Sequence, residues 1–476
     1  MTNNFLYDNL ETKKVEFTLK KNGISSLLLM MRAGDKLYQM VKNNNIDYDE
    51  IIVLAGPGNN GGDAIAFAIQ AKLNDEKITC LSLAIHKNNS KKLFSLAKEI
   101  GLKTKSFNKS HFLKTKSKVL IVDGILGIGI SRKPSGIISK AIKFINKLES
   151  KKNTVVSIDL PSGLNPNNGV AYADTIFSDY TLMLLTRKMG CYTGDGIKNS
   201  GKLSYTDLEI KKIDKLQNTS CILINKNSKV LLKRDKTGHK GKFGNVFILG
   251  GWDNMPGAAN LSALAALKTG CGKIFICTNN FSRIPNEAIR VFPKISDILK
   301  ILQSINVIIA GPGLGNGGSE ILSFLWKKSI PIVLDADGIN WLSKNFIKKR
   351  KSLLIGTPHH GEAKKLLGKS FQDRFNAIKS IKNKYGGKWI LKGPGTLIIN
   401  KKIYVNNFAN SILATAGSGD VLAGIIGGLV AQGCKNPELL GVKIHTYAAN
   451  SIALEKKNTI IASDLLNKIS SSIDVL

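Results

Sequence analysis

The stretch IIVLAGPGNNGGDAIAFAIQAKL, residues 51–73, decides the fold. A continuous apolar run at 51–56 leads through a loop rich in glycine and asparagine to an amphipathic segment that begins at Asp63. Glycines let a backbone approach a ligand closely, and a helix N-terminus offers free N–H groups to anions. We therefore expect a strand, a binding loop and a helix. A tight turn capped by Asp63 is the structural alternative. A Gly-x-Gly-x-x-Gly dinucleotide loop with Glu76 as the ribose-binding acid is a third.

The same alternation continues on both sides of this stretch. Strands are predicted in the first half at 51–56, 78–85, 118–125, 154–160 and 180–185, and in the second half at 245–251, 273–278, 307–311, 331–337, 352–357 and 388–393. Amphipathic stretches such as 63–73 and 137–148 separate them. Continuous apolar strands alternating with helices indicate parallel sheets covered on both faces. We expect two three-layer α/β/α domains, over 1–212 and 225–476, joined by a linker at 213–224.

The bulk composition is that of a globular intracellular protein. A length of 476 residues exceeds what one hydrophobic core serves, and six scattered cysteines without a Cys-x-x-Cys pair fit a reducing cytosol. No signal peptide or membrane span is predicted, so we expect a cytoplasmic protein. The net charge of +35 comes from 69 Lys+Arg against 34 Asp+Glu spread along the chain, which argues against nucleic acid as the partner. The same positive field can attract a polyanionic small molecule.

Acids end two predicted strands of the first half: Asp123 in IVDGILGIGI and Asp159 in SIDLPSGLNPNNG. Ligands of open α/β sheets bind at the carboxyl ends of the strands, although Asp159 before Pro161 could also cap a turn. With GPGNNGGD and Lys188 in LLTRKMG, these motifs resemble the Rossmann-like epimerase domain for hydrated NAD(P)H, over nearly all of 1–212. The resemblance makes Asp159 the acid/base beside the hydrated ring.

The resemblance also implies a potassium ion held by Asn60, Asp123 and Ser162; oxygen ligands suit a hard cation, but the residues alone do not select potassium. It implies dinucleotide binding by Asn59, Asn60, Gly61, Gly62, Asp63, Gly127, Ile128, Gly129, Ile130, Ser131, Arg132, Lys133 and Asp159. Met31 stands where the family usually has glutamate, and Ala64 where it has glycine. An impaired epimerase is the alternative that these two departures leave open.

The second half carries ATAGSGD, residues 414–420, before a helix of small residues. Consecutive N–H groups at a helix start suit phosphoryl oxygens, and Asp420 can accept a proton from a substrate hydroxyl. A plain helix start capped by Ser418 is the structural alternative. HKGKFG (239–244), GGWDNMPGAANL (250–261), GPGLGNGG (311–318), TPHHGE (357–362) and LKGPGT (391–396) accompany the motif. As an ordered series, these motifs resemble the ribokinase-like dehydratase domain for hydrated NAD(P)H.

By this resemblance Asp420 is the catalytic base, and magnesium is expected with the ADP co-substrate. Substrate contacts are implied for Ala258, Gly315, His359 and Asp420. Nucleotide contacts are implied for Lys392, Gly393, Pro394, Gly395, Thr396 and Gly419. His360 replaces a usual proline, and His359, His360 and Glu362 lack the spacing of a zinc site.

The sequence thus predicts a repair enzyme for NADHX and NADPHX that acts as a homo-oligomer without nucleic-acid or membrane partners. The runner-up is a ribokinase-like vitamin or sugar kinase with a degenerate N-terminal domain, which leaves GPGNNGGD without a role. A dehydrogenase leaves GSGD without one, and a basic RNA-binding protein uses only the charge.

Overall fold

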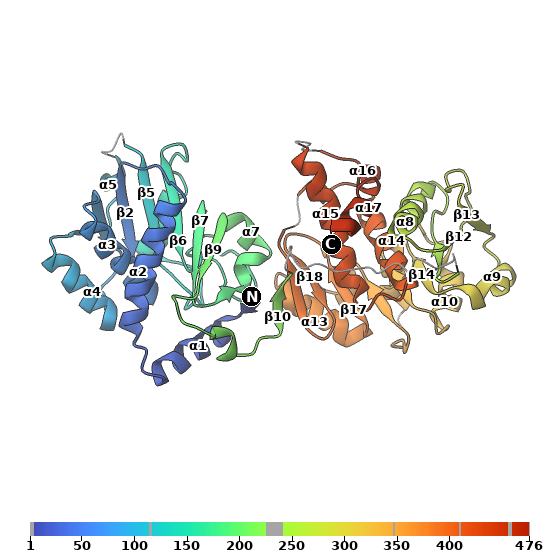
Figure 1. The fold of residues 1–476 in the computed structure, drawn as a ribbon, viewed down its shortest axis with the longest axis horizontal. Coiled ribbons are helices and arrows are strands. Elements are labelled where there is room, and N and C mark those ends of the chain that lie inside the picture. The colour runs from blue at the N-terminus through green and yellow to red at the C-terminus, as the bar shows by residue number, and fades with distance from the viewer. Residues whose placement is uncertain are drawn as a thin grey trace. The chain divides into compact units, whose positions relative to one another are not determined.

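The computed structural model describes residues 4–113, 117–224, 241–345, 348–408, 411–455 and 459–475. The chain divides into two compact units, Met1–Leu223 and Ile224–Leu476, each of which is an α/β body (Figure 1). His239 and Lys240 of the HKGKFG motif lie outside the described residues. Within the described residues, no helix combines the length and the apolar composition that crossing a membrane requires.

The first unit is built on a parallel sheet. The strands of this unit are β1 (Phe5–Tyr7), β2 (Glu50–Ala55), β3 (Ile78–Ser82), β4 (Lys103–Ser106), β5 (Val119–Gly124), β6 (Asn153–Ile158), β7 (Tyr180–Leu184), β8 (Arg187–Lys188), β9 (Lys202–Thr206) and β10 (Cys221–Leu223), of which β1, β8 and β10 lie outside the parallel sheet. Its helices are α1 (Asn9–Lys21), α2 (Ser26–Asn43), α3 (Asn59–Leu73), α4 (Asn88–Glu99), α5 (Ser110–Leu113), α6 (Gly136–Ile145) and α7 (Asp195–Asn199), with short 3₁₀ turns η1 (Met189–Tyr192) and η2 (Ile213–Lys215). All neighbours in the order β4-β3-β2-β5-β6-β7-β9 are parallel. The five strands predicted in this half are confirmed as β2, β3, β5, β6 and β7.

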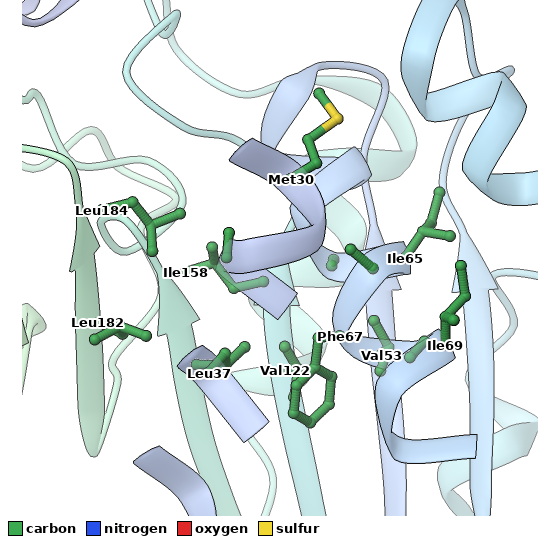
Figure 2. Close-up of a cluster of buried hydrophobic side chains, with 14 of the residues drawn as sticks. Met30, Leu37, Val53, Ile65, Phe67, Ile69, Val122, Ile158, Leu182 and Leu184 are labelled. Atoms are coloured by element: carbon green, nitrogen blue, oxygen red, sulfur yellow. The ribbon is translucent and has the colours of Figure 1, made fainter. Parts of the chain in front are cut away.

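Both faces of this sheet are covered, as the continuous apolar strands predict. Along β2, Ile51 and Val53 point to a cluster with α2 and α3, part of which Figure 2 shows, whereas Ile52 and Leu54 point to a cluster with α6. Figure 2 places Met30 and Leu37 of α2 and Phe67 of α3 over Val53 and Val122. The three-layer α/β/α class predicted for this half is confirmed.

Helix α2 approaches α3 closely because Gly34 has no side chain. A Cβ on Gly34 would lie 2.4 Å from the Ala66 carbonyl carbon. Both residues that depart from the epimerase pattern belong to this packed layer. Met31 packs, half-buried, against the core cluster, and Ala64 is fully buried with its Cβ facing Gly124. The two substitutions are therefore accommodated by packing.

The second unit contains a longer sheet. Its strands are β11 (Asn245–Leu249), β12 (Lys273–Cys277), β13 (Ala288–Val291), β14 (Val307–Ala310), β15 (Ile332–Leu334), β16 (Leu354–Gly356), β17 (Lys388–Leu391), β18 (Thr396–Ile399) and β19 (Ile403–Asn406). Its helices are α8 (Pro256–Thr269), α9 (Ile295–Ile301), α10 (Ser319–Trp326), α11 (Ala336–Asn345), α12 (His360–Leu367), α13 (Arg374–Tyr385), α14 (Ser418–Ala431), α15 (Pro437–Leu454), α16 (Ala462–Leu466) and α17 (Ile469–Val475), with 3₁₀ turns η3 (Leu302–Ser304) and η4 (Ser411–Leu413).

The strand order of the second unit is β13-β12-β11-β14-β15-β16-β17-β18-β19. All pairs up to β17 are parallel, and the last two are antiparallel. The six predicted strands are confirmed. The antiparallel β18–β19 hairpin, to which the LKGPGT motif leads, was not predicted. Figure 1 shows α14 and α15, the helices that follow the GSGD motif, covering one face of the sheet.

Candidate active sites

The first candidate site lies where the strand order of the first unit reverses. β2 is followed outward by β3 and β4 on one side, while β5 continues the sheet on the other. Such switch points open a crevice at the carboxyl ends of the strands. Here α3 begins at Asn59, four residues before the predicted start, with Gly58 as an N-cap that has no capping side chain. Capping by Asp63 is therefore wrong. A Cβ on Gly61 would lie 2.0 Å from the Gly56 carbonyl oxygen, so only glycine fits there.

Asp123, at the end of β5, is fully buried and accepts four hydrogen bonds. The donors are Ser157 Oγ at 2.7 Å, Ser162 Oγ at 2.5 Å, Ser162 N at 2.9 Å and Ile125 N at 3.2 Å. Burial raises the pKa of Asp123, and these hydrogen bonds oppose that rise. The carboxyl group is thus held rigidly between β5 and β6.

Asn60 and Ser162, predicted with Asp123 as cation ligands, meet at one backbone carbonyl. Asn60 Nδ2 donates to the Leu126 oxygen at 3.1 Å, and Ser162 Oγ lies 3.2 Å from the same oxygen. Asn60 Oδ1 is buried and has no hydrogen-bond partner among the residues that the structure describes. A Cβ on Gly127 would lie 3.1 Å from Asn60 Cβ, so the loop 127–133 starts beside this group. The structure brings the three predicted ligands together, whereas Ser131, Arg132 and Lys133 are exposed farther along the loop.

Asp159 directly follows β6 and has a left-handed backbone, with φ of 69°. This conformation is strained for a residue with a side chain and is often found at functional sites. Asp159 forms an ion pair with Lys188, which is only 1% exposed. Lys188 Nζ also donates to the Leu184 oxygen at 2.5 Å, and Leu184 N donates to Asp159 Oδ1 at 3.1 Å. Two hydrogen bonds from β7 and β8 therefore fix the acid.

Two further acids surround the Asp159–Lys188 pair. Burial raises the pKa of Asp63 well above its usual range, and the negative charges of Asp159 and Glu16 add to the effect. Burial also raises the pKa of Glu16, while Lys188 lowers it. Glu16 belongs to α1 and to none of the sequence motifs. Only the tertiary fold could reveal it.

Glu76, the ribose-binding acid of the alternative dinucleotide loop, has a structural role instead. It accepts hydrogen bonds from Tyr38 Oη at 3.0 Å and Tyr48 Oη at 3.1 Å and pairs with Lys42. It precedes β3, whereas ligands bind at the carboxyl ends of strands.

The second candidate site centres on the start of α14. Gly417 is the N-cap with φ of 85°, and no side chain caps this helix, so the capping role considered for Ser418 is wrong. A Cβ on Gly419 would lie 3.0 Å from both Asp335 Oδ2 and Lys392 Nζ. The N–H groups of the first turn and Asp420 therefore lie next to this acid–lysine pair.

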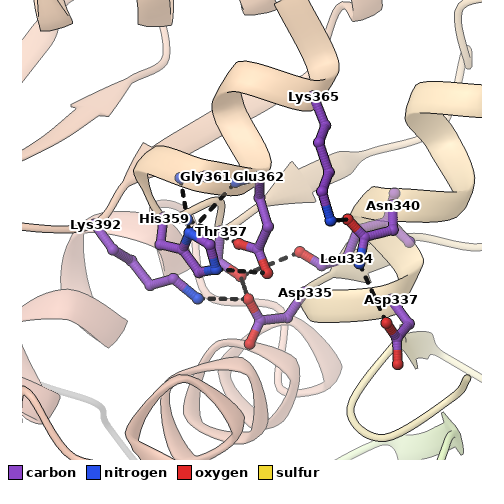
Figure 3. Close-up of polar contacts among 10 residues, drawn as sticks. All are labelled: Leu334, Asp335, Asp337, Asn340, Thr357, His359, Gly361, Glu362, Lys365 and Lys392. Carbon is purple, nitrogen blue, oxygen red and sulfur yellow. Dashed lines mark hydrogen bonds and ion pairs between the residues drawn. The ribbon is translucent and has the colours of Figure 1, made fainter. Parts of the chain in front are cut away.

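The pair joins two strand ends (Figure 3). Lys392, after β17, contacts Asp335 Oδ1 at 2.7 Å, and Thr357 Oγ1 donates to the same oxygen at 2.7 Å. Burial lowers the pKa of Lys392, but the negative charges of Asp335 and Glu362 outweigh this effect, so that the pKa is raised. Burial, with help from Asp335, raises the pKa of Asp420 to about 7, against the effect of Lys392. A carboxyl group with this pKa can both accept and release a proton near neutrality.

His359 caps α12. Its Nδ1 accepts from Gly361 N at 2.9 Å and Glu362 N at 3.3 Å, and Glu362 Oε2 accepts from His359 N at 2.8 Å. Because Nδ1 accepts, the ring proton is on Nε2, and burial keeps the ring neutral by lowering its pKa. Burial raises the pKa of Glu362 to about 7. His360 packs on Phe371 instead, with ring centroids 4.4 Å apart.

Of the predicted nucleotide residues, 392–395 form the loop between β17 and β18, and Thr396 begins β18. Gly393 and Gly395 have φ of 125° and 59°. Arg374, which no motif includes, donates from inside the loop to the carbonyls of Leu391 at 3.0 Å, Lys392 at 3.2 Å and Gly395 at 3.3 Å, and also to that of Pro394. The loop is thus held open around a buried guanidinium.

Ala258 and the loop of Gly315 lie side by side. A Cβ on Gly313 would lie 3.1 Å from Ala258 Cβ, and Gly315 N donates to Asp337 Oδ2 at 2.9 Å. Sequence reasoning missed Asp335 and Asp337, although both stand at the end of the strand predicted at 331–337, as Asp123 and Asp159 stand at the ends of theirs. The strand-end rule could have found them.

Comparison with known proteins agrees with this geometry. A family model described as NAD(P)H-hydrate dehydratase matches residues 246–471, and one described as YjeF-related protein N-terminus matches residues 26–190. The chain is 32% identical to the bifunctional NAD(P)H-hydrate repair enzyme Nnr of Coxiella burnetii, over 97% of each chain. It is 31% identical to the enzyme of that name from Escherichia coli, over 94% of this chain and 89% of the other. Among solved structures, an ADP/ATP-dependent NAD(P)H-hydrate dehydratase from Bacillus subtilis is 28% identical over 51% of this chain and 94% of that one, with a TM-score of 0.46.

The family resemblance predicted from the motifs of each half is confirmed, and in the predicted order. The match to curated relatives extends over nearly the whole chain and includes both sheet edges described above. The chain therefore belongs to the family of bifunctional NAD(P)H-hydrate repair enzymes, in which an epimerase domain precedes a dehydratase domain.

Proposed function

We propose that residues 1–212 interconvert the R and S forms of NADHX and NADPHX at the Asp159 edge. We further propose that residues 225–476 dehydrate the S form with ADP at the Asp420 edge. One observation carries the proposal: each unit holds a buried acid, paired with a lysine, at the carboxyl ends of its parallel strands. These pairs are Asp159 with Lys188 and Asp335 with Lys392. Burial strengthens the effect of such charges on a substrate bound between them.

In the epimerase half, Asp159 is the acid/base at the hydrated ring. Lys188 contacts its Oδ1 and Leu184 N donates to the same oxygen, so the other oxygen remains to exchange a proton with the substrate. The free N–H groups at the start of α3, from Asn59 to Asp63, suit the pyrophosphate, and the loop 127–133 covers its other side. A neutral Asp63, whose pKa is raised, can donate a hydrogen bond to the ligand.

A potassium ion fits the first site. In the described part of the chain, the buried oxygen Asn60 Oδ1 lacks a partner, and the Leu126 carbonyl, the Ser162 hydroxyl and the Asp123 carboxylate supply further oxygens. When bound, a hard cation there would offset the Asp123 charge and attract the phosphates of the dinucleotide.

In the dehydratase half, Asp420 accepts the proton of the ring hydroxyl as the hydroxyl oxygen attacks the terminal phosphoryl group of ADP. AMP leaves. Phosphate then leaves the ring carbon while the neighbouring ring carbon loses a proton, and the electrons of that C–H bond restore the ring double bond of the reduced nicotinamide. The N–H groups at the start of α14, including that of Gly419, stabilise the transferred phosphoryl oxygens. Lys392 adds positive charge at the same place. Ala258, Gly315 and His359 hold the hydrated dinucleotide, and the loop from Lys392 to Thr396 holds the nucleotide.

Magnesium would enter the second site with the nucleotide. The described residues contain no group of three histidine, cysteine or acidic side chains able to hold a metal ion. The phosphates of ADP would therefore supply ligands themselves, as is usual for magnesium in nucleotide sites. The ion would offset the charge of the phosphoryl group during transfer.

The test is to incubate mixed R and S NADHX with the full chain, potassium, magnesium and ADP, and to follow the absorbance of reduced nicotinamide. We expect the whole sample to be restored, and restored faster with ADP than with an equal concentration of ATP. Restoration of the S fraction alone would contradict the epimerase assignment. No restoration with either nucleotide would favour the vitamin or sugar kinase.

We also propose a cytoplasmic, homo-oligomeric enzyme. Its six free cysteines fit a reducing compartment. On α1, Leu10 and Phe17 are 68% and 69% exposed and stand two helical turns apart, which suits a surface covered by a second copy. Sedimentation of the wild type and of Phe17→Lys tests this: the variant should dissociate, and a wild-type monomer would contradict the proposal.

A further inference from the structure

A cavity of about 580 Å³ lies in the second unit, away from the dehydratase residues. Its walls come from the end of α10 and the residues after it, from the last turns of α11, and from residues 348–352. Its volume is within the range of small-molecule sites. No residue assigned above to substrate or nucleotide lines it.

The strand direction separates the two sites. Residues 327–329 precede β15 and residues 348–352 precede β16, whereas Asp335 and Thr357 directly follow these strands. The cavity is therefore at the amino edge of the parallel sheet, opposite the carboxyl edge that carries the dehydratase residues. A ligand in one site cannot touch the other.

Positive charge gathers in this cavity without compensation. Among the described residues, no acidic side chain lines it, and six lysines do: Lys327, Lys328, Lys344, Lys348, Lys349 and Lys351. Elsewhere in the second unit, described lysines such as Lys300, Lys388 and Lys468 pair with carboxylates, but within the described residues none of these six does. Like charges this close raise each other's energy, and a bound polyanion would relieve the repulsion.

The cavity floor is rigid and apolar. Trp326 and Trp341 pack at 57° with ring centroids 5.4 Å apart and are 8% and 6% exposed. Arg350 lies over Trp326 and donates to the carbonyls of Lys328 at 2.7 Å and Ile330 at 2.6 Å, as well as to that of Trp326. The partial negative charge of carbonyls at a helix C-terminus repels anions. The Arg350 guanidinium offsets that charge at the end of α10 and in the residues after it. The wall is thereby suited to negative ligands.

We propose that this cavity is an accessory site for an oligophosphate group, carried by a small nucleotide or by inorganic oligophosphate. The six lysines come from three segments of the cavity wall, and a linked chain of phosphates offers more oxygens to pair with them than a single phosphate does. An apolar floor under the lysines limits water on one side and strengthens their attraction. Binding here would be independent of chemistry at the Asp420 edge.

The test measures binding of inorganic triphosphate to the full chain by calorimetry. In the pocket variant K344E/K348E/K351E, affinity should fall by ~10-fold or more, because three attractive charges become repulsive. The matched control K268E/K379E/K401E changes the net charge equally at exposed lysines outside the cavity, and should keep wild-type affinity. Equal affinity in the two variants would overturn the proposal, since only the overall charge would then matter.

ATP and a short single-stranded RNA identify the source of the phosphates. The ratio of ATP affinities between the pocket variant and the control measures the part of ATP binding that depends on the cavity. If this ratio is larger for ATP than for triphosphate, the cavity recognises a nucleotide. If the two ratios are equal, it recognises the phosphates alone. Both results support the proposal. RNA that binds tighter than triphosphate with the same dependence would overturn it in favour of nucleic acid. If the pocket variant melts early, K344Q/K348Q/K351Q replaces it with the same expectations.

Discussion

Replacing Arg374 with methionine should weaken both the second unit and its nucleotide loop. The guanidinium is 9% exposed and donates to four backbone carbonyls of residues 391–395. Burial lowers its pKa to about 10, so it remains charged near neutral pH. Methionine has a similar length and fills the space of the stem, but donates nothing. The variant thus removes the hydrogen bonds with little change in packing.

The expected loss of stability depends on which of these carbonyls water cannot reach. The bonds to Leu391 at 3.0 Å and Gly395 at 3.3 Å are buried, and those to Lys392 and Pro394 are partly open to water. A hydrogen bond to a charged donor contributes ~1.5–3 kcal/mol, and water can replace only the open ones. We expect the free energy of unfolding to fall by ~3–5 kcal/mol.

Urea unfolding followed by tryptophan fluorescence is the assay for stability. All four tryptophans, Trp252, Trp326, Trp341 and Trp389, belong to the second unit, so the signal reports on that unit within the full chain. The KM for ADP in dehydration is the assay for the loop. Without Arg374 the loop must be ordered when ADP binds, which weakens binding. We expect the KM for ADP to rise about tenfold, which corresponds to a loss of ~1.4 kcal/mol of binding free energy.

Arg350→Met is the matched control. Arg350 has the same chemistry, since burial lowers its pKa to about 10 and it also donates to several backbone carbonyls, but at the amino edge of the sheet. It should destabilise the second unit and leave the KM for ADP unchanged. If Arg374→Met has the same free energy of unfolding as the wild type, the expected loss of stability is wrong. An equal rise in KM for both variants would refute the role of Arg374 in shaping the nucleotide loop.

Three further predictions concern the acids. Asp420→Asn should abolish dehydration and leave epimerisation intact, and Asp159→Asn should do the converse; loss of both activities in one folded variant would contradict separate sites. The dehydration rate should rise with pH through about 7, because burial raises the pKa of Asp420 to about 7 and a base must be ionised. Asp335→Asn removes a charge that raises this pKa and should move the rise to lower pH; an unmoved profile would exclude Asp420 as the titrating base. Because the folded-state pKa of Asp63 is raised, its contribution to stability is present in acid and lost as pH rises. Asp63→Asn should therefore stabilise the first unit near neutral pH but not in acid, as measured by hydrogen exchange, and equal stabilisation at both would contradict the shift.

The fold could be predicted because its central strands are continuous apolar runs. β2 and β5 are buried on both faces, so their sequences are continuous apolar runs, and a length of six residues each favours strands over helices. β4, with the sequence KTKS, escaped prediction because an edge strand that is mostly exposed carries no apolar pattern. The β18–β19 hairpin was not predicted, since its antiparallel pairing depends on a turn rather than on composition.

The site could be predicted where one motif contains both the backbone feature and the functional side chain. The GPGNNGGD loop and Asp420 are of this kind, since the glycines that form the helix start stand next to the polar residue. Arg374 and Glu16 could not be predicted in this way, because each reaches its site from a helix that contains no binding motif. Such residues become visible only when the tertiary contacts are known.

Each acid–lysine pair forms only when the strands that carry its two residues are assembled in the folded sheet. Asp159 and Lys188 are 29 residues apart, and Asp335 and Lys392 are 57 residues apart, so no single motif includes both partners. In both units a residue with a left-handed backbone stands at the acid, Asp159 itself with φ of 69° and Ala336 after Asp335 with φ of 45°. Each such residue costs ~1–3 kcal/mol, which the surrounding sheet must offset. The strained turn lies where an acid leaves its strand and meets a lysine supplied by a later one. Stability of the sheet and chemistry at its edge are therefore linked in both halves by the same device.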